Sequence, residues 1–199
     1  GMPIDENMTM WATFTDYVNV YSVVGGIAVV LLTLVHGLTF IGLRTTGPVH
    51  TRALSVLKKV YYALFGGLVL FAVLTYFNTD LFTVRPVATP VFLGCIVLAA
   101  LLGFIFANKG KEGWAFTMSG LTIVLTVAML FVGLFPRVMI SSIDPAFNLT
   151  INNAASGQYT LSLMTKISLT LLPFVLGYQI WSYYIFRKRI SHKDTVNYK

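Results

Sequence analysis

Few residues in this chain have side chains that could carry out acid–base, nucleophilic or metal chemistry. The sequence holds three histidines and one cysteine. His36 lies in a long apolar run, whereas His50 and His192 lie in polar segments, and no two of them have metal-ligand spacing. Cys95 is alone, which excludes an intrachain disulfide and a cysteine-bound cluster. We therefore predict no catalytic residue and no metal site made by this chain.

His36 is the one histidine that could meet a cofactor inside an apolar segment. It lies eight residues before Arg44, so a helix would place it roughly 12 Å from that charge. Ionisable groups inside a membrane are commonly functional, which makes His36 a candidate haem ligand or proton-relay member. The alternative is a neutral histidine bonded to a neighbouring helix or to interfacial water. We favour the alternative, because haem needs an axial partner that this chain does not obviously supply.

The composition predicts an integral membrane protein. Of the 199 residues, 56% are hydrophobic and only 11% are charged, and the mean hydropathy is +0.77. A water-soluble fold of this size could not bury so much apolar surface. A bilayer span needs about 20 mostly apolar residues, and five stretches meet that need, at about 17–43, 60–77, 89–107, 114–135 and 162–187. Lipid cannot satisfy exposed backbone groups, so each stretch is predicted to be a helix.

The expected fold class is therefore an all-α integral membrane protein with five transmembrane helices. We divide the chain into an external segment 1–16, a membrane domain 17–190 and a cytoplasmic tail 191–199. The membrane domain includes a polar external loop at 136–160.

The basic residues predict the orientation of these spans. Of the 14 lysines and arginines, eleven fall on one side, and only Arg85, Arg137 and Lys166 fall on the other. By the positive-inside rule, the N-terminus lies outside and the C-terminus lies in the cytoplasm. The net charge of +7 is spread over three separate cytoplasmic segments rather than one groove, so we exclude nucleic acid as a partner.

Four residues near the ends of predicted spans are candidates for subunit contact or membrane anchoring: Arg137, Lys166, Gln179 and Trp181. Arg137 could pair with Asp144, contact a partner subunit, or hold the end of its helix by snorkelling. Lys166 lies one turn inside its span, where its long side chain reaches the interface. Gln179 could hydrogen-bond to another helix.

The last third of the sequence carries motifs of a known family. A Phe-Pro-x-Val-Met corner at 135–139 precedes an Asn-Leu-Thr-Ile loop at 148–151. A Gln-Ile-Trp-Ser-Tyr element at 179–183 is followed by an Arg-Lys-Arg stop at 187–189. In this order the motifs resemble the C-terminal end of subunit II of bacterial cytochrome bd-type quinol oxidases. The resemblance extends over about 17–190 and is most specific in its second half.

The resemblance implies a function in aerobic respiration. It implies that the chain is part of a terminal oxidase in the bacterial plasma membrane, which oxidises quinol, reduces oxygen to water and generates a proton-motive force. Haem b and haem d would lie in the partner subunit I, so this chain would ligate no cofactor, although it could bind a structural quinone. Its role would be to stabilise subunit I and to shield the redox centres from membrane lipid and water.

The resemblance also implies a preceding helical half of subunit II, which opens with a Gly-Phe-Asp-Phe-Gly element that this sequence lacks. We therefore expect the chain to be the C-terminal portion of subunit II. Two other classes remain open, a membrane transporter and a structural subunit of another membrane complex. A transporter would need polar groups at the midplane and two pseudo-symmetric halves. An acidic residue or a second broken helix at the midplane would strengthen that interpretation, and neither is evident. A structural subunit fits the composition equally well.

Overall fold

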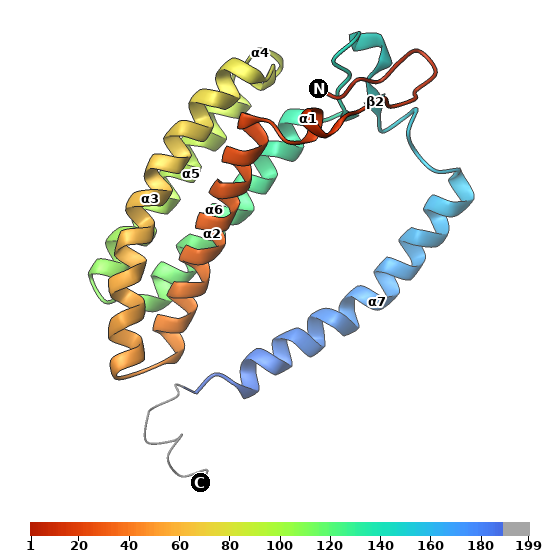
Figure 1. Ribbon diagram of the computed structural model, residues 1–199. Helices are drawn as coiled ribbons and strands as arrows, with labels where there is room; N and C mark the ends of the chain where they lie inside the picture. The colour runs from red at the N-terminus through yellow and green to blue at the C-terminus, as the bar shows by residue number, and fades with distance from the viewer. Residues whose placement is uncertain (189–199) are drawn as a thin grey trace.

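The fold is a bundle of long helices with a small cap at one end (Figure 1). The structure, a computed structural model, describes residues 1–188. Within this range, five helices are long and apolar enough to cross a membrane. They are α2 (Val20–Arg44), α3 (Pro48–Asn78), α5 (Ala88–Asn108), α6 (Glu112–Leu134) and α7 (Gln158–Ile185). The predicted fold class is confirmed, whereas the side on which each end lies stays a prediction. The predicted tail 191–199 lies outside the described residues.

Short elements gather at the end of the bundle that we call the cap end. They are α1 (Phe14–Tyr17), α4 (Leu81–Val84), β1 (Arg137–Met139), η1 (Pro145–Phe147) and β2 (Leu149–Thr150). Strands β1 and β2 pair antiparallel, with Arg137 opposite Thr150. The N-terminal segment packs on this hairpin, because Ser141 Oγ donates to the Ile4 carbonyl at 2.8 Å and Ile4 is buried. The cap is therefore built from two segments that are far apart in the sequence.

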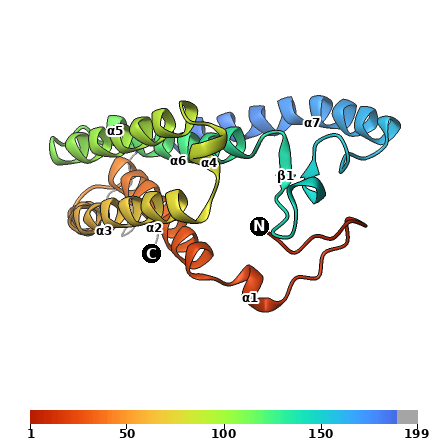
Figure 2. The ribbon, with the colours of Figure 1, turned by 90° about the horizontal axis from the view of Figure 1, so that it is seen from above.

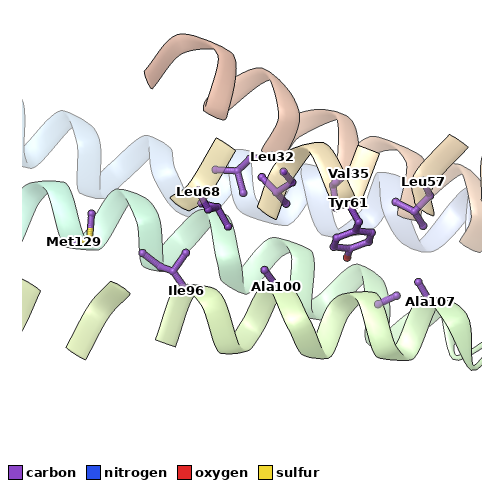
Figure 3. Close-up of a cluster of buried hydrophobic side chains, with 11 residues drawn as sticks. Leu32, Val35, Leu57, Tyr61, Leu68, Ile96, Ala100, Ala107 and Met129 are labelled. Atoms are coloured by element: carbon purple, nitrogen blue, oxygen red, sulfur yellow. The ribbon is translucent and has the colours of Figure 1, made fainter. Parts of the chain in front are cut away.

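Four of the long helices form the bundle. Helix α2 packs along α3 and α6, and α5 packs along α6. Figure 2 shows α5 and α6 on one side of the bundle, with α2 and α3 on the other. Their shared core is a cluster of large and small apolar side chains (Figure 3). It includes Leu32, Val35, Leu57, Tyr61, Leu64, Leu68, Ile96, Ala100, Ala107, Ala115 and Met129.

Small residues bring α5 and α6 close together. The buried face of α5 includes Ala99, Ala100, Gly103 and Ala107, which lie three or four residues apart. The buried face of α6 begins with Ala115 and continues through Ser119 and Thr122 at the same spacing. Between membrane helices, such residues stabilise association by allowing close backbone approach, because lipid supplies no hydrophobic driving force.

Helix α3 is longer than its predicted span of about 60–77. It begins at Pro48 and continues for 31 residues. Gly47, with φ of 75°, turns the chain at the N-cap, and Pro48 suits the first helical position because its missing N–H has no intrahelical partner there. Hydropathy locates only the part inside lipid, so it missed the first three turns.

Helix α7 stands apart from the other four. None of its residues is buried, and it diverges from the bundle along most of its length (Figure 1). Its contacts with the bundle are near its C-terminal end. There Tyr183 meets Phe40 edge-on at 6.3 Å between ring centroids, and Arg44 Nη1 donates to the Arg187 carbonyl at 2.5 Å.

The contact between Tyr61 and Gly103 yields a stability prediction. Tyr61 is 1% exposed, and within residues 1–188 its hydroxyl has no hydrogen-bond partner. A Cβ at position 103 would lie 2.6 Å from that hydroxyl oxygen but 3.7 Å from the Tyr61 ring carbon Cζ. We expect Gly103→Ala to destabilise the bundle by about 1–3 kcal/mol through overpacking. Thermal unfolding in detergent measures the change.

Tyr61→Phe provides the matched control, since it removes an unpaired hydroxyl and no hydrogen bond. We expect it to leave stability unchanged or raise it. In the Tyr61→Phe background, Gly103→Ala should lower the free energy of unfolding by much less than in the wild type. An equal loss of stability in the two backgrounds would show that the hydroxyl is not what excludes a side chain at position 103.

Candidate functional site

His36 lies between two helices inside the bundle. Its Nδ1 is 2.9 Å from the Ser119 hydroxyl of α6, and its ring stacks on Phe116 with 4.5 Å between centroids. Gly120 lies beside the ring, since a Cβ there would be 3.4 Å from the imidazole Cε1. Thr39, one turn along α2, reaches the same place, with its hydroxyl 3.2 Å from that of Ser119. The result is a small polar cluster with Ser119 at its centre.

The two hydroxyl groups of this cluster also bond to backbone carbonyls of their own helices. The Ser119 hydroxyl donates to the Phe116 carbonyl at 2.8 Å, and the Thr39 hydroxyl donates to the His36 carbonyl at 2.7 Å. These bonds tie the cluster to the backbone of both helices.

His36 thus forms a hydrogen bond to a neighbouring helix, which is the alternative that we favoured over a cofactor role. Within residues 1–188, no group of three or more His, Cys, Asp or Glu side chains is placed to hold a metal ion. The candidate cofactor role itself stays a prediction. Sequence reasoning missed Ser119 as the partner, because a lone serine in an apolar span carries no signal of what it faces.

Arg137 forms an ion pair at the cap end. Its Nη1 and Nη2 donate to the two carboxylate oxygens of Asp80, at 2.5 and 3.1 Å. The suggested pairing with Asp144 is wrong, because the Asp144 carboxylate instead accepts from the Ala146 backbone N–H at 2.7 Å. Asp80 lies between α3 and α4, so the pair joins that junction to strand β1. Subunit contact by Arg137 stays a prediction.

The hydrogen bonds from Arg137, supported by its charge, hold the pKa of Asp80 below the ordinary value of 3.8. Beside the pair lies a cavity of about 400 Å³, bordered by Asp80, Asp16, Tyr21 and Met139. Arg85, at the end of α4, donates to the Phe135 carbonyl at 3.0 Å, so a second arginine secures the C-terminal end of α6. These contacts make the cap end a tightly connected surface.

A second charged contact lies at the other end of the bundle, which we call the basic end. His50, in the first turn of α3, bonds through Nε2 to the carboxylate of Glu112, in the first turn of α6. A carboxylate is favourable at the N-terminal end of a helix, where backbone N–H groups are unpaired. The contact therefore joins the basic ends of α3 and α6. Sequence reasoning placed His50 in a polar segment but identified no partner for it.

The other three candidates, Lys166, Gln179 and Trp181, lie on α7 and are exposed. Trp181 is 60% exposed, and its ring lies 6.2 Å from that of Tyr178 on the same helix. The structure thus does not bring the five candidates together. His36 lies within the bundle, Arg137 lies at the cap end, and the three residues of α7 present a surface of their own. Their role in subunit contact or anchoring stays a prediction.

Comparisons with known proteins identify relatives along most of the chain. A family model described as cytochrome bd terminal oxidase subunit II matches residues 1–186. Cytochrome bd ubiquinol oxidase subunit 2 of Bacillus subtilis is 48% identical over 198 residues, which is 100% of this chain and 59% of that protein. Cytochrome bd-I ubiquinol oxidase subunit 2 of Escherichia coli is 27% identical over 227 residues, covering 98% and 60% of the respective chains. The chain spans about three fifths of the length of these curated relatives.

The ion pair at the cap end predicts a pH dependence of stability. The pKa of Asp80 is lowered in the folded protein, so the pair stabilises the fold above pH 3.8 and loses that effect as the pH falls through the lower folded-state pKa. We expect Asp80→Asn to lower the unfolding midpoint at pH 7, by a small amount because Asp80 is partly exposed.

The gap between wild type and Asp80→Asn should narrow when the midpoint is measured below about pH 4. Arg137→Gln serves as the control, since it removes the other partner. In the double variant, the unfolding midpoint should fall by less than the sum of the two single changes. A gap that stayed constant down to pH 3 would contradict a stabilising role for the ion pair.

Proposed function

The chain belongs to the cytochrome bd terminal oxidase subunit II family, and we propose that it acts as part of a membrane complex that oxidises quinol and reduces oxygen to water. The match of the family model over residues 1–186 carries this proposal. With its five apolar helices, the chain is a multi-pass bacterial membrane protein. The alternatives of a transporter and of a structural subunit of another complex receive no support from the relatives.

Within the complex we assign this chain a supporting role. The proposed division of labour places haem b, haem d and the quinol-oxidising site in the partner subunit I. Two features of the described residues support it. His36 is held by Ser119 and Phe116, and His50 is held by Glu112, so each is engaged in contacts between helices. The bundle then has the character of a packed scaffold that shields redox centres from lipid and water.

Helix α7 is the part of the chain that we propose to contact other helices of the complex. It carries polar residues at several depths, including Lys166 and Gln179, and none of its residues is buried by the rest of the chain. Polar side chains in a membrane helix generally face protein rather than lipid. Trp181 is a large, exposed anchor for such a contact.

The proposal predicts how a change in α7 affects assembly. The wild-type chain, purified from its native membranes in mild detergent, should carry the haem b and haem d bands of a reduced-minus-oxidised spectrum and quinol-dependent oxygen uptake. Trp181→Ala should lower the haem recovered with the chain more than it lowers oxygen uptake per haem. An aromatic anchor at an interface typically contributes about 2 kcal/mol or more.

Trp114→Ala is the matched control. Trp114 lies on α6, is 58% exposed, and packs against Phe106 of the same chain at 6.0 Å between centroids. We expect this variant to recover more haem than Trp181→Ala. Normal recovery of haem with lost turnover in Trp181→Ala would reject the supporting role, and a colourless wild-type preparation without oxygen uptake would reject the oxidase assignment.

A further inference from the structure

The basic end holds a second cavity, of about 610 Å³, between α3 and the turn from α5 to α6. Helix α3 contributes Thr51, Ser55, Lys58 and Lys59, which recur at the spacing of one helix face. The opposite wall includes Asn108, the last residue of α5. We call this space the lysine cavity.

The charge of the lysine cavity is positive. Within residues 1–188, neither Lys58 nor Lys59 forms an ion pair. His50, which bonds to the carboxylate of Glu112, borders the cavity as well. Lys109 flanks the opposite wall in the sequence. Two adjacent ammonium groups in a hollow attract an anion, because opposite charge relieves their mutual repulsion.

The lysine cavity lies where lipid headgroups are expected. Helix α3 has 31 residues, and at 1.5 Å per residue it extends about 46 Å, against roughly 30 Å for the hydrocarbon layer. The span predicted from hydropathy begins at about residue 60, so Lys58 and Lys59 fall at the boundary between hydrocarbon and headgroups. Either orientation of the chain gives this depth.

The surroundings of the lysine cavity suit an amphiphile better than a free anion. Leu54 and Ala107 give it an apolar lining, while Thr51 and Ser55 supply hydroxyl groups. One turn further into the membrane on α3, Tyr62 is 67% exposed and meets Phe104 of α5 edge-on at 5.5 Å between centroids. This exposed aromatic surface continues the cavity into the apolar layer, where acyl chains lie.

We propose that the lysine cavity binds the phosphate group of an anionic phospholipid, with its acyl chains along Tyr62 and Phe104. Lys58 and Lys59 supply the charge, and the hydroxyl group of Ser55 can donate a hydrogen bond to a phosphate oxygen. The Thr51 hydroxyl donates to the Gly47 carbonyl at 3.3 Å, so its oxygen only borders the cavity. Basic pockets between membrane helices are known to take phospholipid headgroups through this chemistry. The bound lipid joins α3 to α5 at the basic end.

Lipid binding to the protein tests this proposal. The chain is purified in mild detergent with the proteins that remain bound to it, and native mass spectrometry measures binding of phosphatidylglycerol and of zwitterionic phosphatidylcholine. We expect Lys58→Gln and Lys59→Gln each to weaken phosphatidylglycerol binding about fivefold. Binding of phosphatidylcholine should not change. Lys188→Gln is the control, because it removes one positive charge near the end of the described chain, outside the cavity.

Three outcomes of these binding measurements overturn the proposal. The first is that Lys188→Gln weakens phosphatidylglycerol binding as much as the cavity variants do, which would reflect general surface charge. The second is that neither cavity variant weakens phosphatidylglycerol binding. The third is displacement of the lipid by an equal concentration of glycerol 3-phosphate, which would make this a site for free phosphates. If the variants fail to fold, the salt dependence of lipid binding to the wild type still tests the proposal. Added salt must weaken phosphatidylglycerol binding, and insensitivity to salt would also overturn the proposal.

Discussion

The close packing of α5 on α6 is the interaction on which the rest of the structure depends. Between membrane helices there is no gain from excluding water, so association depends on contact area and on small residues that permit it. Gly103 on α5 marks that contact, because a Cβ there would lie 3.4 Å from the Met118 Cβ of α6. Once α6 is placed, Ser119 faces His36 on α2 and Glu112 faces His50 on α3. One seam of small residues thus positions the polar contacts of the other two helices.

The two ends of the bundle are secured by charged contacts in a region where water and headgroups reach them. At the cap end, Arg137 joins strand β1 to Asp80, and at the basic end Glu112 joins α6 to His50. Charged side chains placed at helix ends avoid most of the desolvation cost that they would carry in the hydrocarbon layer. The hydrocarbon-spanning middle relies on packing, with the cluster around Ser119 as a neutral polar contact. This division explains why the chain needs few charged residues.

Composition was sufficient to predict the five helices, because long apolar runs have only one stable form in lipid. It was insufficient to predict contacts between side chains that are far apart in the sequence. Pairing with Asp144, seven residues away, was one of three roles considered for Arg137, whereas its partner Asp80 is 57 residues away. Ser119 looked like an ordinary polar residue in an apolar span until α2 was placed against it. The first turns of α3 were missed because hydropathy detects only the part of a helix that lies in lipid. The separation of α7 from the bundle could not be predicted, because the residues of α7 alone do not show what the helix packs against.

The central claim is that this chain supports an oxidase without ligating its haems. The most direct test replaces all three of its histidines, His36, His50 and His192, with asparagine in one variant, and compares the reduced-minus-oxidised spectrum of the assembled complex with that of the wild type. The account predicts the full haem b and haem d bands per assembled complex. Loss of either band from a complex in which every subunit is still present would place a haem ligand in this chain and contradict the account.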